Sequence, residues 1–196
     1  RKSLKSKQDE IEYSYKKECL DEIKTLEKQG YIDLYYGDQS GFCLTPVMAY
    51  CWQYVGEQVE ILPQKGKRIN VFGLMSRGRK LTAFSKQGSI NAQFIVDSID
   101  QWVKTITKPT VLVLDNAPVH QAKVLQAKLE QWQEQNLFIF FLPAYSPHLN
   151  QIEILWRKLK YEWLKPQSYC SIESLQEALN DIWMQFGQQY FINFKD

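Results

Sequence analysis

Histidine is scarce in this chain, which has only two among 196 residues. Zinc sites are usually built from cysteine and histidine at short spacings, and the four cysteines, at positions 19, 43, 51 and 170, form no Cys-x-x-Cys pair. The sequence therefore argues against a zinc site. Four scattered cysteines also favour reduced thiols in a cytosol over a disulfide framework.

Long hydrophobic runs are missing as well. No apolar run approaches the 18 or so residues that a membrane-spanning helix needs, and no signal peptide is recognisable. We therefore expect no membrane partner and a cytoplasmic location. The chain opens on Arg1 rather than methionine, so we expect a longer protein with a preceding N-terminal part.

The net charge is only +2, and it points to no particular partner. The distribution is more informative, because residues 65–80 hold six basic residues and no acid: Lys65, Lys67, Arg68, Arg77, Arg79 and Lys80. Two interpretations stay open. The segment is either a pair of solvated strand ends with a turn, or an edge that faces a polyanion such as nucleic acid.

Hydrophobic periodicity and turn residues predict a series of helices and strands. Helices are expected at 7–30, 89–106 (with Ser89 as a possible cap), 118–135 (with Pro118 in its first turn), 151–164 and 171–186. Strands are expected at 31–42 (ending near Asp38), 68–76, 80–88, 110–114 and 137–142, with a loop and short strand around 50–54.

The two short apolar strands at 110–114 and 137–142 flank a predicted helix. A strand–helix–strand unit of this kind makes the strands parallel, with both faces covered. Before it comes a hairpin joined by residues 77–79. A meander followed by alternating strands and helices favours an α/β fold with a ribonuclease H-like mixed five-stranded sheet flanked by helices.

Three acids lie where such a sheet places functional groups, beyond strand ends or at a helix start. They are Asp38, Asp115 and Glu153. Each also has a structural explanation: Asp38 as a turn residue, Asp115 as a helix cap, and Glu153 as the partner of Asn150 in a capping box. Together, three rigidly held carboxylates suit magnesium ions, which can promote phosphoryl transfer in pairs.

The motifs around these acids resemble the catalytic domain of DDE transposases, in the bacterial insertion-sequence branch of the mariner superfamily. The resemblance rests on LVLDNAPVHQAK around Asp115, on FFLPAYSPHLNQIEILWRKLK around Glu153, and on DQSGF from Asp38. It covers about residues 31–165. Asp38, Asp115 and Glu153 match the family's metal-binding catalytic triad.

The resemblance implies two magnesium ions, with manganese as a substitute, and no small-molecule substrate. It implies DNA cleavage at transposon ends and strand transfer into target DNA at TA sites, by a nucleoid-associated homodimer. Asn116 and Asn150 match motif positions that we interpret as hydrogen-bonding the acidic loops. His120 has open interpretations: it orients a metal-bound water, contacts a DNA phosphate, or only caps and packs.

We expect residues 1–30 to be a lead-in helix from a missing N-terminal DNA-binding region, and residues 31–196 to be the catalytic domain. For Trp156, and for Trp183, Phe186 and Tyr190, core packing is the favoured interpretation. Two other functions stay open. A ribonuclease H-like nuclease would hydrolyse without joining ends, and a domesticated non-catalytic DNA-binding protein would bind no magnesium or manganese.

Overall fold

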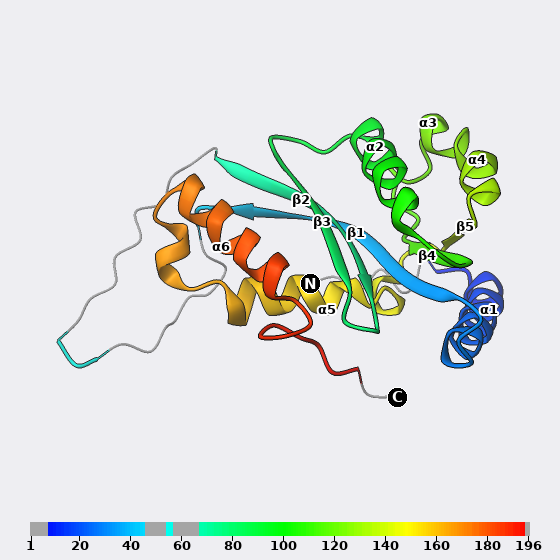
Figure 1. Ribbon diagram of the computed structural model, residues 1–196, viewed down its shortest axis with the longest axis horizontal. Helices are drawn as coiled ribbons and strands as arrows, with labels where there is room; N and C mark the ends of the chain where they lie inside the picture. Colours follow the sequence, from blue (N-terminus) through cyan, green and yellow to red (C-terminus); the bar gives the residue numbers. More distant parts are fainter. Residues whose placement is uncertain (1–7, 46–53, 57–66, 195–196) are drawn as a thin grey trace.

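The computed structural model describes residues 8–45, 54–56 and 67–194. Its centre is a five-stranded sheet in the order β3-β2-β1-β4-β5 (Figure 1). β1 pairs antiparallel with β2 and parallel with β4, so the predicted mixed five-stranded sheet is confirmed. The strands are β1 (Asp33–Cys43), β2 (Arg68–Ser76), β3 (Leu81–Gln87), β4 (Thr110–Leu114) and β5 (Leu137–Phe141).

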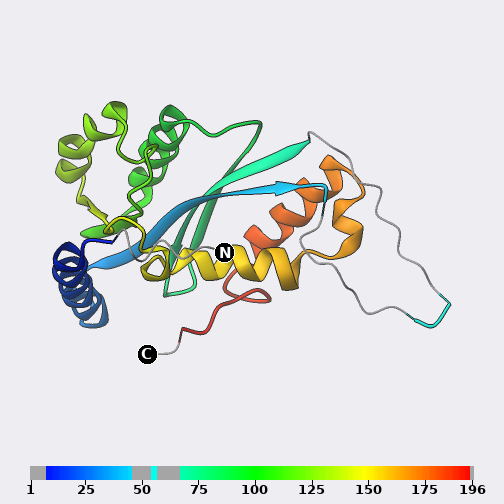
Figure 2. The same cartoon turned by 180° about the vertical axis from the view of Figure 1, so that it is seen from behind.

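Helices cover both faces of the sheet, as Figures 1 and 2 show. One face carries α2, α3 and α4, and the other carries α5 and α6. Their bounds are α1 (Glu10–Lys28), α2 (Ala92–Trp102), α3 (Lys123–Gln126), α4 (Leu129–Glu134), α5 (Ile152–Lys158) and α6 (Ile172–Gln185). The sheet therefore has a hydrophobic core on each side.

The alternation of side chains along β1 sorts its residues between the two cores, because successive side chains of a strand point to opposite faces. Tyr35 packs edge-on against Trp102 of α2. Leu34, Tyr36 and Phe42 belong to the core under α5 and α6. By the same alternation, Asp38 faces α5.

β1 continues through Asp38 to Cys43, which corrects the expectation that the strand ends near Asp38. Its pairing with β2 runs without interruption from Tyr35 to Cys43, so Asp38 lies in mid-strand and is not a turn residue. Pairing with β4 covers only Asp33–Tyr36. Asp38 thus stands where β1 has lost its neighbour on one side.

The predicted helix at 118–135 is also corrected. Residues 118–121 form a turn, followed by the two short helices α3 and α4. Pro118 therefore lies in a turn, where backbone hydrogen bonds from His120 and Gln121 to Ala117 close the chain. Because of this turn, His120 points back toward Asp115, and the first helix after β4, α3, begins only at Lys123.

Other helix ends differ in detail. Asn91, rather than Ser89, caps α2 by accepting a hydrogen bond from the Phe94 amide, because its side chain stands three residues ahead of that amide. Ser171 caps α6 in the same way. Beyond α5, residues Leu159–Trp163 continue as a π-helix. The predicted strand around 50–54 lies outside the described residues apart from Tyr54.

Candidate active site

The register of β1 and β4 brings Asp38 and Asp115 together. The parallel pairing advances one residue at a time and sets Tyr36 beside Val113. Continuing it by two residues places Asp38 opposite Asp115, just past the end of β4. Two carboxylates thus meet where the paired part of the sheet stops, as expected for a ligand site in an α/β fold.

The environment of Asp38 opposes its ionisation. Burial raises the pKa of Asp38 to about 7, and the negative charges of Asp115 and Glu153 add to this rise. The Gln39 backbone amide and His120 act in the opposite direction without cancelling it. Across the sheet face, the Trp156 indole Nε1 donates a hydrogen bond of 3.0 Å to Asp38 Oδ2. The site therefore holds more negative charge than its neighbours neutralise.

Asp115 has the opposite character, because His120 supports its ionised form. Burial alone would raise its pKa, but hydrogen bonds from His120 and the Ala117 amide hold the pKa of Asp115 below its usual value. His120 Nδ1 lies 2.6 Å from Asp115 Oδ1, and the Ala117 amide lies 3.2 Å from the same oxygen. His120 is fully buried, so it orients this carboxylate from inside the protein.

Glu153 stands in the first turn of α5 with its side chain exposed. The loop before it is tied to β1, because the Asn150 side-chain amide donates a hydrogen bond of 3.1 Å to the carbonyl of Gly37, beside Asp38. The capping box that is the alternative interpretation for Asn150 and Glu153 does not form, because the Asn150 side-chain oxygen accepts no hydrogen bond within the described residues. The Asn150 amide instead joins two of the three acidic segments.

The carboxylates interact electrostatically but do not meet at one point. In the described part of the chain, no three His, Cys, Asp or Glu side chains lie close enough to hold a metal ion. The donor set still fits a hard divalent cation, because it consists of carboxylates whose mutual repulsion a cation would relieve. Ligation by Asp38, Asp115 and Glu153 remains a prediction.

The other predicted site residues have different places. Asn116 is exposed, and no hydrogen bond from its side chain occurs among the described residues. The basic residues do not form one patch. Lys67 and Arg68 lie at the start of β2, whereas Arg77, Arg79 and Lys80 lie at its other end or in the hairpin turn. Lys65 is outside the described residues.

Two features of α5 and its extension were missed in the sequence. The core position predicted for Trp156 is confirmed by its 3% exposure, but its bond to Asp38 was not foreseen. Lys160 is half-buried: burial lowers its pKa, while Glu153 and Asp38 act to raise it. Lys160 is seven residues after Glu153, two helical turns on, and this spacing was the signal that could have identified it.

The mixed five-stranded sheet flanked by helices is the fold of ribonuclease H-like catalytic domains. The profile of the DDE superfamily endonuclease family matches residues 33–176, and the chain belongs to this family. It is 26% identical over 147 residues to the uncharacterised 39 kDa protein of insertion element IS630 from Shigella sonnei, covering 70% of this chain and 40% of that protein. The resemblance seen in the motifs is thereby confirmed.

Solved structures with the same fold include transposases and an integrase. The Mos1 transposase paired-end complex with the left transposon end gives a TM-score of 0.62 at 18% identity, covering 90% of this chain and 55% of that one. The Mos1 mariner catalytic domain gives 0.56 at 14%, covering 90% and 82%. The HTLV-2 integrase catalytic core gives 0.52 at 14%, covering 83% and 91%.

This chain therefore spans about half or less of the Mos1 and IS630 proteins, at 55% and 40% of their lengths. None of the described helices has the length and hydropathy to cross a bilayer.

Proposed function

We propose that this chain is the catalytic domain of a transposase that cleaves DNA at transposon ends and transfers the cut strand to target DNA. One observation carries the proposal: Asp38 faces Asp115 and Glu153 at the open edge of the sheet, and their charges help raise its pKa to about 7. A buried carboxylate that two other carboxylates repel, in a fold of this family, suits divalent-cation-dependent phosphoryl transfer.

Asp38, Asp115 and Glu153 would hold magnesium, or manganese in its place, as two ions. When bound, the cations would supply positive charge for the oxygen that attacks phosphorus and for the oxygen that leaves. The chain's other residues fix the three acids. His120 holds Asp115 in its ionised form, Trp156 orients Asp38, and Asn150 ties the loop before Glu153 to β1.

The reaction proceeds in two substitutions at phosphorus. Water forms a new P–O bond as the bond between phosphorus and the 3′ oxygen breaks, which leaves a 3′ hydroxyl at the element end and a 5′ phosphate. That 3′ hydroxyl then attacks a target phosphodiester, loses its proton, and displaces the target's own 3′ oxygen. By family resemblance, the target is TA and movement is by cut and paste.

The assembly belongs to the same proposal. Mos1 transposase forms a paired-end complex with its transposon end, and a homodimer would bring two ends together here. Residues 1–30 would join the catalytic domain to an N-terminal DNA-binding region. The chain would act on bacterial DNA in the cytoplasm, at the nucleoid. Trp183, Phe186 and Tyr190 pack against the core under α5 and α6, in agreement with the core packing favoured for them in the sequence.

A strand-transfer assay tests the proposal. Labelled duplexes that carry the element's ends are mixed with a target plasmid and magnesium, and joined products are counted. We expect Asp115→Asn and Glu153→Gln to lower joining by about a thousandfold or more, because each removes a charge that a cation needs. Glu162→Gln, at an exposed acid on the same helical segment, is the matched control.

The outcomes separate the alternatives. Joining that persists in Asp115→Asn would contradict the proposal. Hydrolysis without joining by the wild type would indicate a ribonuclease H-like nuclease. Absence of magnesium and manganese binding in calorimetry would indicate a non-catalytic DNA-binding protein.

A further inference from the structure

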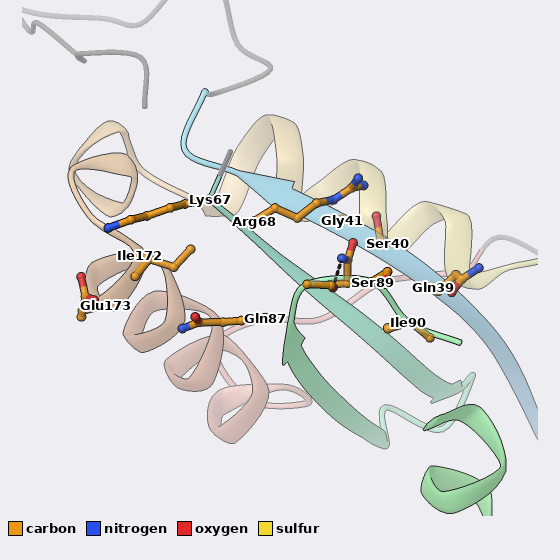
Figure 3. A pocket seen from close by; sticks show the side chains of 12 residues that line it. Gln39, Ser40, Gly41, Lys67, Arg68, Gln87, Ser89, Ile90, Ile172 and Glu173 are labelled. Atoms are coloured by element: carbon orange, nitrogen blue, oxygen red, sulfur yellow. Dashed lines mark hydrogen bonds between the residues drawn. The ribbon is translucent and has the colours of Figure 1, made fainter. Parts of the chain in front are cut away.

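A polar cavity of about 750 Å³ opens beside the edge of the sheet that carries Asp38 and Asp115 (Figure 3). It lies where β1 and β2 extend beyond α2. Gln39, Ser40 and Gly41 form one wall and directly follow Asp38, while Lys67, Arg68 and Asn70 come from β2. The lining of the cavity thus begins at the residue that follows Asp38 in β1.

Gly41 makes room for Arg68. In Figure 3 the Arg68 side chain runs from β2 across β1 at Gly41. A Cβ atom at position 41 would overlap the Arg68 guanidinium and would stand 2.7 Å from Asn70 Oδ1. Real Cβ atoms do not approach so closely, so only glycine at position 41 leaves Arg68 in this place. The Arg68 guanidinium therefore lies close against β1 at Gly41.

Arg68 is exposed, and it carries a charge that no described carboxylate neutralises by an ion pair. By contrast, Lys67 acts on Glu173, whose pKa it helps to lower. Arg77 and Arg79 lie over the rings of Phe194 and Phe191.

Arg68 lies across β1 three residues beyond Asp38 and on the opposite face of the sheet, because Asp38 faces α5 whereas Gly41 points to the other side. Three residues of strand separate Asp38 from Gly41, which is about 10 Å. B-DNA rises by about 3.4 Å per nucleotide along its helix axis. Neighbouring backbone phosphates lie farther apart than this because the strand winds around the axis, so roughly one to two nucleotides span the distance from Asp38 to Gly41. Along the same half of β1, Lys160 lies over the Phe42 ring on the face that carries Asp38.

We propose that Arg68, laid across Gly41, binds a backbone phosphate of DNA close to the reacting phosphate. A guanidinium presents paired N–H donors that match two phosphate oxygens. This contact holds the DNA strand along the part of β1 that is not paired with β4, and it does not distinguish one base from another. This inference rests on the proposed function, because it assigns the path of the same DNA substrate.

Fluorescence anisotropy with a labelled DNA duplex in EDTA tests the site without any catalysis. We expect Arg68→Ala to weaken binding about tenfold at low salt and to reduce the slope of log K against log salt by about 1, as for one lost phosphate contact. Gly41→Ala should show the same loss because its methyl group displaces the guanidinium. In the double variant the second change should add nothing.

Two matched controls accompany these variants. Lys104→Ala removes an exposed charge after α2, and Gly78→Ala adds a methyl group that meets only Ser76 Oγ, at 3.6 Å. Both should bind DNA like the wild type. Wild-type affinity and salt slope in Arg68→Ala would overturn the inference. So would a further loss when Gly41→Ala is added to Arg68→Ala, because Gly41 would then act independently of Arg68.

The two proposals can fail separately. If the wild type joins ends in magnesium but Arg68→Ala leaves binding unchanged, the phosphate site is wrong and the transposase proposal stands. If Arg68→Ala weakens binding as expected but no cleavage or joining occurs, the site stands as a DNA-binding site and the catalytic proposal fails. A wild type that does not bind DNA overturns both.

Discussion

Two aspartates one strand apart have opposite electrostatic settings. Asp38 is buried near two like charges, and its pKa is raised to about 7. Asp115 receives hydrogen bonds from His120 and the Ala117 amide, and its pKa is lowered. His120, whose role was left open by its motif, therefore orients an acid. At neutral pH the site carries a costly charge on Asp38 that a cation would stabilise.

Asp38→Asn should stabilise the metal-free protein. The raised pKa means that Asp38 takes up a proton on folding between its unfolded pKa, about 4, and its folded pKa, about 7. Stability therefore falls as pH rises through this window and stays low above it. In thermal unfolding with EDTA, we expect the variant to exceed the wild type by on the order of 5 °C at pH 8, and by less at pH 5.

The exposed Asp97 of α2 provides the control substitution, Asp97→Asn, which should leave the pH profile unchanged. Added magnesium should stabilise the wild type and not Asp38→Asn. An Asp38→Asn protein that unfolds at the wild-type temperature at pH 8 would show that the acid is not repelled in the folded state.

For individual helices and strands, the sequence predicted those features that depend on the local hydrophobic pattern. The bounds of β2 and β4 agree with the predicted 68–76 and 110–114, because short apolar runs between turn residues identify strands. The extension of β1 past Asp38 depends on pairing with β2, and the turn after Asp115 depends on His120. Both features depend on contacts between segments or side chains, which the hydrophobic periodicity of a sequence does not reveal.

In the candidate site, too, local motifs could be predicted from the sequence and long-range contacts could not. The motifs singled out Asp38, Asp115 and Glu153, whose role as metal ligands stays a prediction, and the structure brings Asp38 and Asp115 to one edge although Asp38 lies in mid-strand. The Trp156–Asp38 hydrogen bond links residues 118 apart, and the Asn150–Gly37 bond links residues 113 apart. Such bonds depend on how α5 crosses β1, which is a property of packing rather than of either segment.

The packing of α5 on the sheet depends on Gly73, which pairs with Asp38 in β2. A Cβ atom there would stand 2.7 Å from Trp156 Cη2, and the ring, 3% exposed, has little room to move. Gly73→Ala should lower the free energy of unfolding by about 1–3 kcal/mol through overpacking. It should also reduce strand transfer, because Trp156 would shift away from Asp38.

Denaturant unfolding and the joining assay measure the two effects. The control is Gly78→Ala, which should change the free energy of unfolding by less than about 0.5 kcal/mol. Unchanged stability and joining in Gly73→Ala would mean that α5 is free to adjust its position on the sheet.

For the whole molecule, α1 is the element whose role is least evident. It bears exposed apolar residues, including Ile11 at 84% and Tyr15 at 64%, yet Leu20 is fully buried in the core beneath α5 and α6. Tyr13 hydrogen-bonds His148 at 3.0 Å, in the loop that leads to Glu153. α1 thus packs on the catalytic domain near its acidic edge. Its connection to a DNA-binding region stays a prediction.

Leu20→Ala should destabilise the whole chain by about 2–5 kcal/mol, because it removes a fully buried side chain from the core. Chemical denaturation followed by tryptophan fluorescence reports this loss, since all described tryptophans lie outside α1. Ile11→Ala, at an exposed position of the same helix, should cost less than about 0.5 kcal/mol. Equal effects of the two substitutions would mean that α1 is a separable lead-in.

The unequal lengths of β1 and β4 have a consequence for handling the protein. Within the described residues, no strand pairs with the β4 side of β1 from Asp38 onward, and a bare strand edge is a template on which another copy can add a strand and aggregate. Charged side chains at such an edge discourage that addition. Arg68, whose side chain lies across β1 at Gly41, is one of these charges. Arg68→Ala therefore also removes protection against self-association, and the solubility of this variant has to be measured beside its DNA binding.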